Sequence, residues 1–395
     1  MSEALQAVWW VLALLPVAAF SGWLIGRRGA ERSGGQRVSR LSSSYFRGLN
    51  FLLNEQPDKA IEVFLQIAEV DKDTVETHFA LGNLFRRRGE VDRAIRIHQN
   101  LIERPHLSED QRIQAVLELG EDFMRAGLLD RAEGLFADLV KVHGGVAPKA
   151  LRHLISIYQL ERDWPKAIEH ARQYEAATGE PMGKLLAQFH CELVEIARTS
   201  GDVEQARTHL RAAYDADSHS ARAGIISGRM ALAEGDDAAA IRAFERVARH
   251  DVDYLPEVLQ SLLQACARTG ERGRLRAFLA EMIERFPGVT PMLALARLIE
   301  QDDGVDAARQ FLTRQLRRRP SVRGQKALID LGLDESAETS RDTLRLLGEL
   351  SEQLVAGEAA YRCGHCGFGA RAHHWQCPSC KRWDTIKPVH GAFGE

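Results

Sequence analysis

The chain has 395 residues and a nearly balanced charge, with 52 Lys and Arg against 55 Asp and Glu and a net charge of −3. This balance argues against a strongly basic nucleic-acid binder, and the length allows more than one module. Four of the six cysteines fall between positions 363 and 380, whereas Cys191 and Cys266 stand alone. We expect these two to be buried apolar residues.

An apolar segment begins the chain and predicts a transmembrane anchor over residues 1–28. No charged residue lies between Glu3 and Arg27, which leaves 23 uncharged positions. In a helix that rises about 1.5 Å per residue, this length matches the ~30 Å hydrocarbon core of a bilayer. A cleavable signal peptide would have a basic residue before a shorter apolar core, and a buried soluble helix would usually carry a polar stripe.

The charges after this segment predict its orientation. Five arginines and a single acidic residue, Glu31, follow the apolar run within residues 27–40, and no basic residue precedes it. By the positive-inside rule, the amino terminus faces out and the bulk of the chain faces the cytoplasm. Residues 29–44 are rich in Gly, Ser and Arg, and they predict a short juxtamembrane linker.

Between residues 45 and 320 the chain repeats itself with a period near 34 residues. One alanine returns at steps of 34, 38, 35, 39 and 34 residues: Ala60, Ala94, Ala132, Ala167, Ala206 and Ala240. A small residue followed four positions later by an apolar one, such as Phe64 or Phe136, is typical of the tetratricopeptide repeat. Each such repeat is a pair of antiparallel helices. We count about eight repeats and predict an all-α solenoid, an architecture that binds other molecules.

Turn residues separate the predicted helices. One lies between the two helices of each repeat: Gly89, Gly127, Asp163, Gly201, Gly235 and Gly270. We expect each to end the helix before it. After Pro320 the period is lost, but residues 321–357 keep a helical stripe that includes Leu346, Leu350 and Leu354. We expect this segment to cap the array.

Residues 358–395 carry the strongest chemical signal. Cys363-x2-Cys366 and Cys377-x2-Cys380 form two pairs with ten residues between them. Four thiolates at this spacing can surround one metal ion as a tetrahedron. Gly367 permits the positive φ that turns backbone amides toward the sulfurs. We predict that these four cysteines hold one iron or zinc ion, and that the site is not catalytic because four protein ligands leave no open position.

Other side chains near the cysteines also have predicted roles. Three histidines are alternative ligands that four thiolates make superfluous, and we expect them to face solvent: His365, His373 and His374. Three aromatic residues are expected to supply the small core that about 30 residues otherwise lack: Phe368, Trp375 and Trp383. Four basic residues are expected to offset the negative charge of the thiolates: Arg362, Lys381, Arg382 and Lys387.

Two further classes of function stay open at this point. One is a redox or electron-transfer protein that uses a thiolate-bound iron, which would colour the purified protein red. The other is a nucleic-acid-binding zinc ribbon, because the last 35 residues carry five basic and two acidic side chains. Salt-sensitive binding to RNA or DNA would reveal it. We expect no nucleic-acid partner, since the basic residues form no continuous face.

From end to end, the chain resembles the lipopolysaccharide assembly protein B family of Gram-negative bacteria. The resemblance is carried by LPVAAFSGWLIGRR in the anchor, by NFLLNEQPDKAIEVFL and LGNLFRRRGEVDRAIRIHQ in the first repeats, and by YRCGHCGF and WQCPSCKRWDTIKP near the end. An anchor, a repeat array and rubredoxin-like cysteine pairs in this order are more specific than any one of them. The family's metal ligands correspond to Cys363, Cys366, Cys377 and Cys380.

The resemblance implies a non-enzymatic adaptor of the bacterial inner membrane. Proteins of this family promote degradation of the deacetylase that commits precursor to lipid A. A membrane-bound ATP-dependent zinc metalloprotease performs the cleavage, and a lipopolysaccharide-sensing membrane protein opposes it. The family is also proposed to gather lipopolysaccharide assembly enzymes at the membrane. These proteins are the implied partners; whether two copies of this chain form a homodimer stays open.

Overall fold

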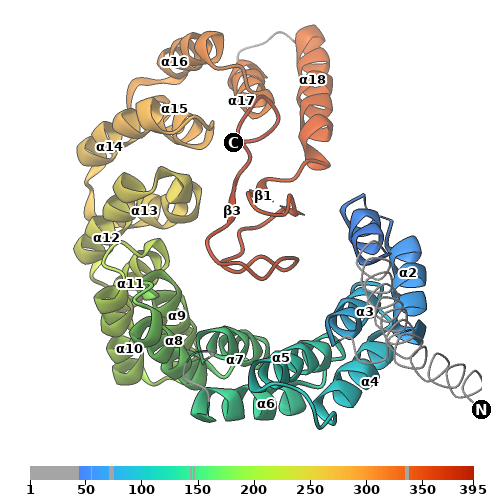
Figure 1. Ribbon diagram of the computed structural model, residues 1–395. Coiled ribbons are helices and arrows are strands. Elements are labelled where there is room, and N and C mark those ends of the chain that lie inside the picture. Colours follow the sequence, from blue (N-terminus) through green and yellow to red (C-terminus); the bar gives the residue numbers. More distant parts are fainter. Residues whose placement is uncertain (1–43, 55, 71–74, 143–144, 146, 334–337) are drawn as a thin grey trace, which may run out of the picture. The chain divides into compact units, whose positions relative to one another are not determined.

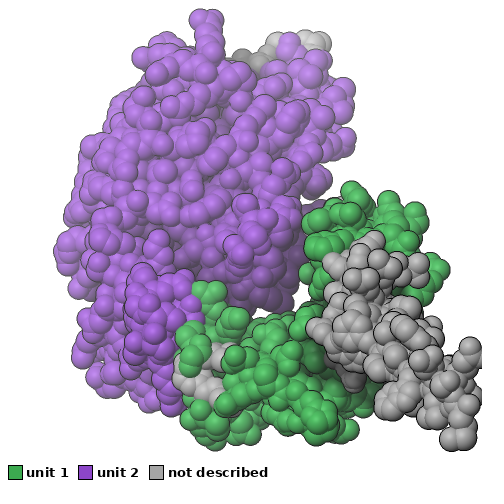
Figure 2. All heavy atoms as spheres, viewed as in Figure 1, with its two compact units in different colours: residues 1–162 green, residues 163–395 purple. Residues whose placement is uncertain are grey.

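The computed structural model describes residues 44–54, 56–70, 75–142, 145, 147–333 and 338–395. The predicted anchor and almost all of the predicted linker lie outside these residues. Within the described ranges, no helix is both long and apolar enough to span a bilayer. The chain divides into two compact units, residues 1–162 and residues 163–395 (Figure 2). Each unit has hydrophobic core clusters of its own.

Both units consist mainly of paired helices (Figure 1). In the first unit, a helix over residues 44–53 precedes α2 (Pro57–Val70), α3 (Val75–Arg87), α4 (Val91–Ile102), α5 (Glu109–Arg125), α6 (Leu129–Val142) and α7 (Ala147–Glu161). The second unit contains α8 (Trp164–Thr178), α9 (Gly183–Thr199), α10 (Val203–Ala216), α11 (Ala221–Glu234), α12 (Asp237–His250), the short 3₁₀ helix η1 (Val252–Tyr254), α13 (Leu255–Thr269), α14 (Arg272–Arg285), α15 (Thr290–Asp303), α16 (Val305–Arg318), α17 (Val322–Leu333) and α18 (Glu338–Ala356). These helices confirm the predicted tetratricopeptide-repeat solenoid.

The six alanines that mark the period are fully buried, with 0% of each exposed. The residue four positions later is often a phenylalanine, and its ring packs on a glycine of the first helix: Phe64 on Gly48, Phe136 on Gly120 and Phe244 on Gly228. A Cβ atom at any of these glycines would overlap the ring. In the pair formed by α3 and α4, His98 takes the place of the phenylalanine and packs on Gly82. Small residues on both helices therefore allow the close crossing that the sequence pattern predicts.

In most repeats, a residue in the left-handed backbone conformation ends the first helix. Five of the predicted turn residues have φ between 72° and 82°: Gly89, Gly127, Gly201, Gly235 and Gly270. The prediction for Asp163 is wrong. Arg162 is the left-handed residue after α7, with φ 59°, and Asp163 instead begins α8, where its carboxylate accepts a hydrogen bond from the Lys166 amide.

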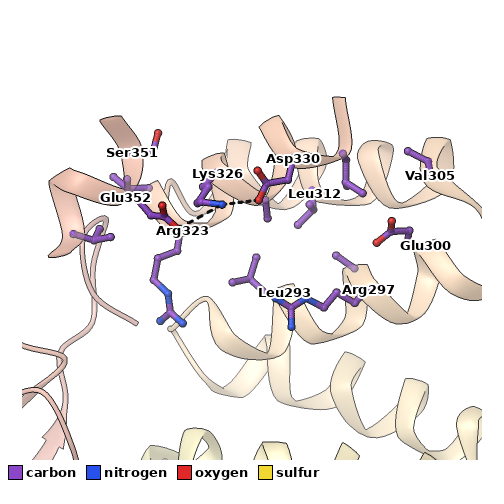
Figure 3. A pocket seen from close by; sticks show the side chains of 15 residues that line it. Leu293, Arg297, Glu300, Val305, Leu312, Arg323, Lys326, Asp330, Ser351 and Glu352 are labelled. Carbon is purple, nitrogen blue, oxygen red and sulfur yellow. Dashed lines mark hydrogen bonds and ion pairs between the residues drawn. The ribbon is translucent and has the colours of Figure 1, made fainter. Parts of the chain in front are cut away.

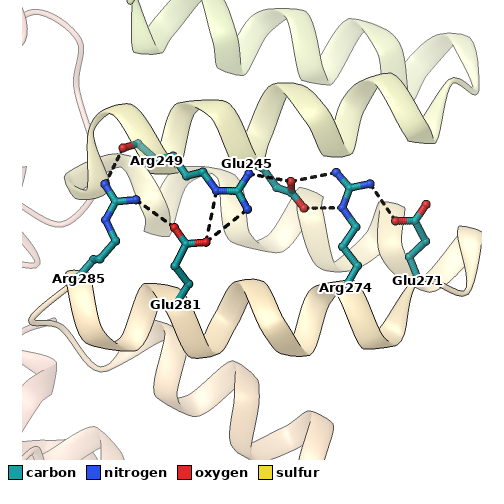
Figure 4. A network of polar contacts seen from close by, with 6 residues as sticks. All are labelled: Glu245, Arg249, Glu271, Arg274, Glu281 and Arg285. Carbon is teal, nitrogen blue, oxygen red and sulfur yellow. Dashed lines mark hydrogen bonds and ion pairs between the residues drawn. The ribbon is translucent and has the colours of Figure 1, made fainter.

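Charged side chains also join successive repeats. Between α12 and α14, the buried Glu245 accepts two hydrogen bonds from Arg274, from Nε at 2.8 Å and from Nη2 at 2.9 Å. Arg249 donates to Glu245 at 3.3 Å and also pairs with Glu281 (Figure 4). Because Glu245 is buried and fully paired, this network stabilises one alignment of the two helices.

The last residues fold as a small antiparallel sheet in the order β2-β1-β3: β1 (Tyr361–Cys363), β2 (Gly369–Ala370) and β3 (Ile386–Pro388). Cys363 lies opposite Ile386 across β1 and β3. The sheet and its cysteine loops, residues 361–388, are called the module here. Within the second unit, the helices from α8 to α17 curve around it (Figure 1).

Candidate metal centre

Two loops bring the four cysteines together. In the first, Cys363 ends β1, and the Gly367 amide donates to the Cys363 carbonyl at 3.0 Å. Gly367 has φ 78°, which confirms the positive φ expected there. In the second, the Lys381 amide donates to the Cys377 carbonyl at 2.9 Å, and Lys381 adopts a left-handed φ of 59°. Both loops therefore turn tightly directly after a cysteine pair.

The sulfur atoms have the spacing of a tetrahedral metal site. Cys363 Sγ lies 3.8 Å from Cys380 Sγ, and Cys366 Sγ lies 3.7 Å from Cys377 Sγ. All four sulfurs fall within 4.8 Å of one another. A tetrahedron with metal–sulfur bonds of about 2.3 Å has edges of about 3.8 Å. The four thiols therefore fit one ion, and in the described part of the chain no other three His, Cys, Asp or Glu donors come this close.

Hydrogen bonds at two of the four sulfurs, those of Cys363 and Cys366, favour the thiolate form that a metal requires, whereas the neighbouring thiols raise the pKa of Cys380 to about 11. Thr385 Oγ1 lies 3.3 Å from Cys363 Sγ. The hydrogen bond with this hydroxyl, together with backbone amides of the first loop, lowers the pKa of Cys363 to about 5. The Phe368 amide lowers the pKa of Cys366 in the same way. Such a site is partly deprotonated before a metal arrives, which favours metal binding at neutral pH.

The two isolated cysteines are not part of this site. Cys191 and Cys266 are buried in α9 and α13, with 0% and 1% exposed. Burial raises the pKa of Cys191 to about 12 and that of Cys266 to about 11. Both behave as small apolar residues, which confirms the expectation from the sequence.

The histidines near the cysteines differ in their surroundings. His365 and His374 are exposed, as predicted. The prediction is wrong for His373, whose ring packs edge-on against Tyr254 of η1, with the ring centroids 5.4 Å apart. It also packs against Tyr361 and Trp375 of the module. His373 therefore lies at a boundary between the module and the repeat helices.

The two tryptophans lie at the same boundary and not in the core of the module, so the prediction that they form this core is wrong. The core contains Cys363, Cys377 and Ile386 with Tyr361 and Phe368 against them. Trp383 instead packs edge-on against Trp164 of α8 and Phe189 of α9, with centroid distances of 6.1 and 6.2 Å. Trp375 stacks on Tyr254 at 5.3 Å. The module is too small to enclose two indoles, and the repeat helices supply the apolar surface that covers them.

A buried arginine lies between these indoles. The guanidinium of Arg222 from α11 is 5.5 Å from the Trp375 ring centroid and 5.7 Å from that of Trp383. Its Nη2 donates to Glu192 of α9 at 2.7 Å. Cation–π contacts of this kind strengthen when water is excluded, and Arg222 is only 5% exposed.

Polar contacts complete the attachment of the module. Asp384 accepts hydrogen bonds from Gln188 Nε2 at 3.0 Å and from the Tyr254 hydroxyl at 3.0 Å, and burial raises its pKa. Lys387 pairs with Asp251 at 2.8 Å. Lys387 is one of the four basic residues expected to offset the thiolates, and its ammonium group pairs with Asp251 and Asp253 of the repeat array. Asp384 has φ 56°, so its position depends on the loop that follows Cys380.

Comparison with known proteins agrees with this architecture. The family model of a rubredoxin metal binding domain matches residues 361–388. Tetratricopeptide-repeat models match residues 77–111, 117–181 and 191–253. Among solved structures, the MamA protein is 17% identical, with 47% of this chain and 96% of that chain covered and a TM-score of 0.33. This score is too low to support a further conclusion.

Two curated relatives match nearly the whole chain. Lipopolysaccharide assembly protein B of Escherichia coli (strain K12) is 41% identical over 382 residues, covering 96% of this chain and 98% of the relative. The protein of the same name from Haemophilus influenzae is 34% identical over 385 residues, covering 95% and 97%. At these identities and coverages, the chain belongs to the lipopolysaccharide assembly protein B family.

Proposed function

We propose that this protein is a non-enzymatic adaptor that regulates lipopolysaccharide synthesis at the inner membrane of its cell. The observation that carries the proposal is the match over 96% of the chain to relatives named for lipopolysaccharide assembly. The geometry supports the proposal, because stacked helix pairs form an extended surface that can bind other proteins. The thiol site fits an ion with four protein ligands and leaves no position for a substrate.

The proposed action is to bring a client to a protease. The client is the deacetylase of the lipid A pathway, and the protease is the membrane-bound ATP-dependent zinc metalloprotease. A lipopolysaccharide-sensing membrane protein opposes this action. Residues 1–28 anchor the chain, with the repeats on the cytoplasmic side. Holding two proteins at one membrane raises their effective concentration, so weak contacts suffice to promote cleavage. The same array could gather lipopolysaccharide assembly enzymes.

We assign Cys363, Cys366, Cys377 and Cys380 as ligands of one iron or zinc ion. The ion would hold the loop after Cys380 in the conformation that directs Trp383 and Asp384 toward α8, α9 and η1. Metal binding then supports the folded second unit in the way that structural zinc supports small domains. The site thus has a structural role in an adaptor.

A Cys363→Ser, Cys366→Ser double variant tests this role. We expect metal content, measured by mass spectrometry of the purified protein, to fall from one ion per chain to nearly none. The helical circular dichroism signal should stay nearly intact, because the helices of both units keep their contacts with neighbouring helices and loss of the metal makes those of the second unit open more often without unfolding them. The deacetylase should become long-lived in cells, measured by immunoblot after synthesis is stopped. Normal turnover of the deacetylase with metal-free protein would refute the proposed role.

The matched control is Cys191→Ser plus Cys266→Ala, which removes two thiols outside the site. These changes should leave the metal content unaltered.

Electron transfer is a second candidate function, favoured by the exposure of Cys366 at the edge of the site. It requires iron: a red protein that bleaches reversibly on reduction would support it, and a colourless protein with one bound zinc that still promotes deacetylase turnover would refute it.

A further inference from the structure

The last helix of the second unit, α18, exposes a row of leucines. Leu346, Leu347, Leu350 and Leu354 are 55%, 43%, 46% and 59% exposed. Leu346, Leu350 and Leu354 follow one another at intervals of four residues, and Leu347 lies three before Leu350, so the four form one stripe along the helix. Single exposed leucines are ordinary, but a continuous stripe of four on a soluble helix is typical of a contact surface. We call these four residues the leucine stripe.

The contacts of α18 with the rest of the unit use a different face. Gly348 lies toward Ile329 of α17, and a Cβ atom added to this glycine would lie 3.8 Å from Ile329 Cγ2. Ser351 and Glu352 line a cavity of about 490 Å³ together with residues of α15, α16 and α17. Lys326 of α17 joins Asp330 at 2.9 Å and Glu352 at 3.6 Å on this side (Figure 3). None of the four leucines is among the residues that line this cavity, and between 43% and 59% of each is exposed.

The position of α18 at the end of the helix array explains why the leucine stripe is exposed. In earlier pairs the second helix is covered by the first helix of the following pair: Leu316 of α16 packs on Gly324 of α17, and Leu312 is 1% exposed. After α18, the described chain continues through residues 357–360 into β1, and no further helix follows. A repeat array whose end is not covered needs a polar outer face. The α18 face is apolar, so another helix can complete the stack.

The charge beside the stripe restricts which helix this is. Asp342 and Glu349 are exposed and lie four residues before and three residues after Leu346, along one margin of the stripe. Asp342 has an exposed partner, Arg345, at 3.4 Å. Glu349 has no ion-pair partner among the residues that the structure describes. The whole helix carries four acidic and two basic residues. This margin is complementary to lysine or arginine.

We propose that the leucine stripe of α18 binds an amphipathic helix of another protein, whose apolar stripe is bordered by Lys or Arg. A second copy of this chain fits less well, because antiparallel two-fold pairing of two α18 helices places their acidic margins on the same side. A lipid surface also fits less well, since anionic bilayers attract basic helices and α18 is acidic. Leucines supply the buried area, and Glu349 and Asp342 select the sign of the partner's charge.

Three synthetic helices of 18 residues test the proposal with the full-length protein. The first has a leucine stripe bordered by lysine, the second has the same stripe bordered by glutamate, and the third has the composition of the first in scrambled order. Fluorescence anisotropy of a labelled peptide gives the affinity. We expect the first peptide to bind at least about tenfold more tightly than the other two. Equal binding of the scrambled peptide, or equal binding of the glutamate peptide, would overturn the proposal.

Variants of this chain locate the site. Leu350→Asp should weaken binding of the lysine-bordered peptide about tenfold or more, because it places a charge in the centre of the buried stripe. Ile196→Asp is the matched control, since Ile196 of α9 is a single exposed apolar residue at 50%. A double variant, Asp342→Lys with Glu349→Lys, should prefer the glutamate-bordered peptide. An unchanged preference would overturn the proposal. Self-association that Leu350→Asp abolishes, or vesicle binding that it abolishes, would assign the stripe to a second copy or to lipid instead.

Discussion

The polar side chains of the repeat helices find their hydrogen-bond and ion-pair partners in different places in the two units. In the second unit, Gln188, Tyr254 and Asp251 make their hydrogen bonds and ion pairs with the cysteine module. In the first unit, side chains from neighbouring repeats bond to one another. Contacts between adjacent repeats also occur in the second unit, as at Glu245 and Arg274, but that unit depends in addition on a segment far away in the sequence.

The network of the first unit has a fully buried centre. Asp122 of α5 accepts a hydrogen bond from His98 Nδ1 at 2.5 Å and another from Arg86 Nη1 at 2.9 Å. Both Asp122 and His98 are 0% exposed. Arg86 also pairs with Glu118, and Glu121 lies 3.4 Å from His153 of α7. Helices α3, α4, α5 and α7 are thus joined by polar and charged side chains, and one of these, His98, stands where other repeats have phenylalanine.

The largest expected effect comes from removing this centre. Asp122→Ala leaves His98 without its buried partner and takes one carboxylate from Arg86, which keeps Glu118. We expect the free energy of unfolding of the first unit to fall by about 3–5 kcal/mol. Urea unfolding measures the loss of unfolding free energy, and hydrogen exchange of the backbone amides in α3–α6 shows that the loss lies in the first unit. Asp58→Ala removes a carboxylate that is 79% exposed from its pair with Arg88, and it should cost about 1 kcal/mol or less. Equal losses for the two variants would mean that the network contributes little.

A smaller loss is expected at the boundary in the second unit. Trp383→Ala removes the indole that contacts Trp164, Phe189 and Arg222. Because Trp383 is partly exposed, we expect the free energy of unfolding of the second unit to fall by about 2–4 kcal/mol. The rate of backbone amide hydrogen exchange should rise in α8, α9 and α11 and stay unchanged in α3–α6. Phe393→Ala, at a side chain that is 52% exposed, is the matched control. A loss confined to the module itself would show that the indole does not support the repeat helices.

Mild acid should affect the second unit through a pair of histidines in α9 and α10. Burial, with His209 and Arg172 nearby, lowers the pKa of His190 to about 4, and burial also lowers the pKa of His209. The folded pKa lies below the unfolded value of about 6.5, so the stabilisation is complete above pH 6.5 and is lost as the pH falls toward 4. We expect a loss of at most about 3 kcal/mol by pH 4. His190→Leu should flatten the pH dependence of unfolding; an unchanged slope would exclude this pair as its source.

Much of the fold follows from local sequence patterns. The period of the alanines predicts the helix pairs, because a helix crossing requires a small residue at a fixed position in each repeat. The spacing of Cys363, Cys366, Cys377 and Cys380 predicts a group of thiols that the structure brings together. Both signals are contained within a few tens of residues.

The boundary between module and repeats could not be predicted in the same way. Asp384 and Gln188 are separated by 196 positions, and neither belongs to a periodic motif. The one available signal was composition: a module of about 30 residues with two tryptophans has more aromatic surface than it can bury alone. His98 escaped prediction because its motif, DRAIRIH, has a polar residue at the phenylalanine position, and only the structure shows Asp122 beside it.

Hydrogen exchange with and without metal tests most directly whether the cysteine module is a structural part of the second unit. The full-length protein is compared with the Cys363→Ser, Cys366→Ser variant under native conditions. We predict faster exchange in the module and also in α8, α9, α11 and η1, with no change in α3–α6. Faster exchange limited to residues 361–388 would contradict this account, because it would describe an independent metal domain on a repeat array that folds without it.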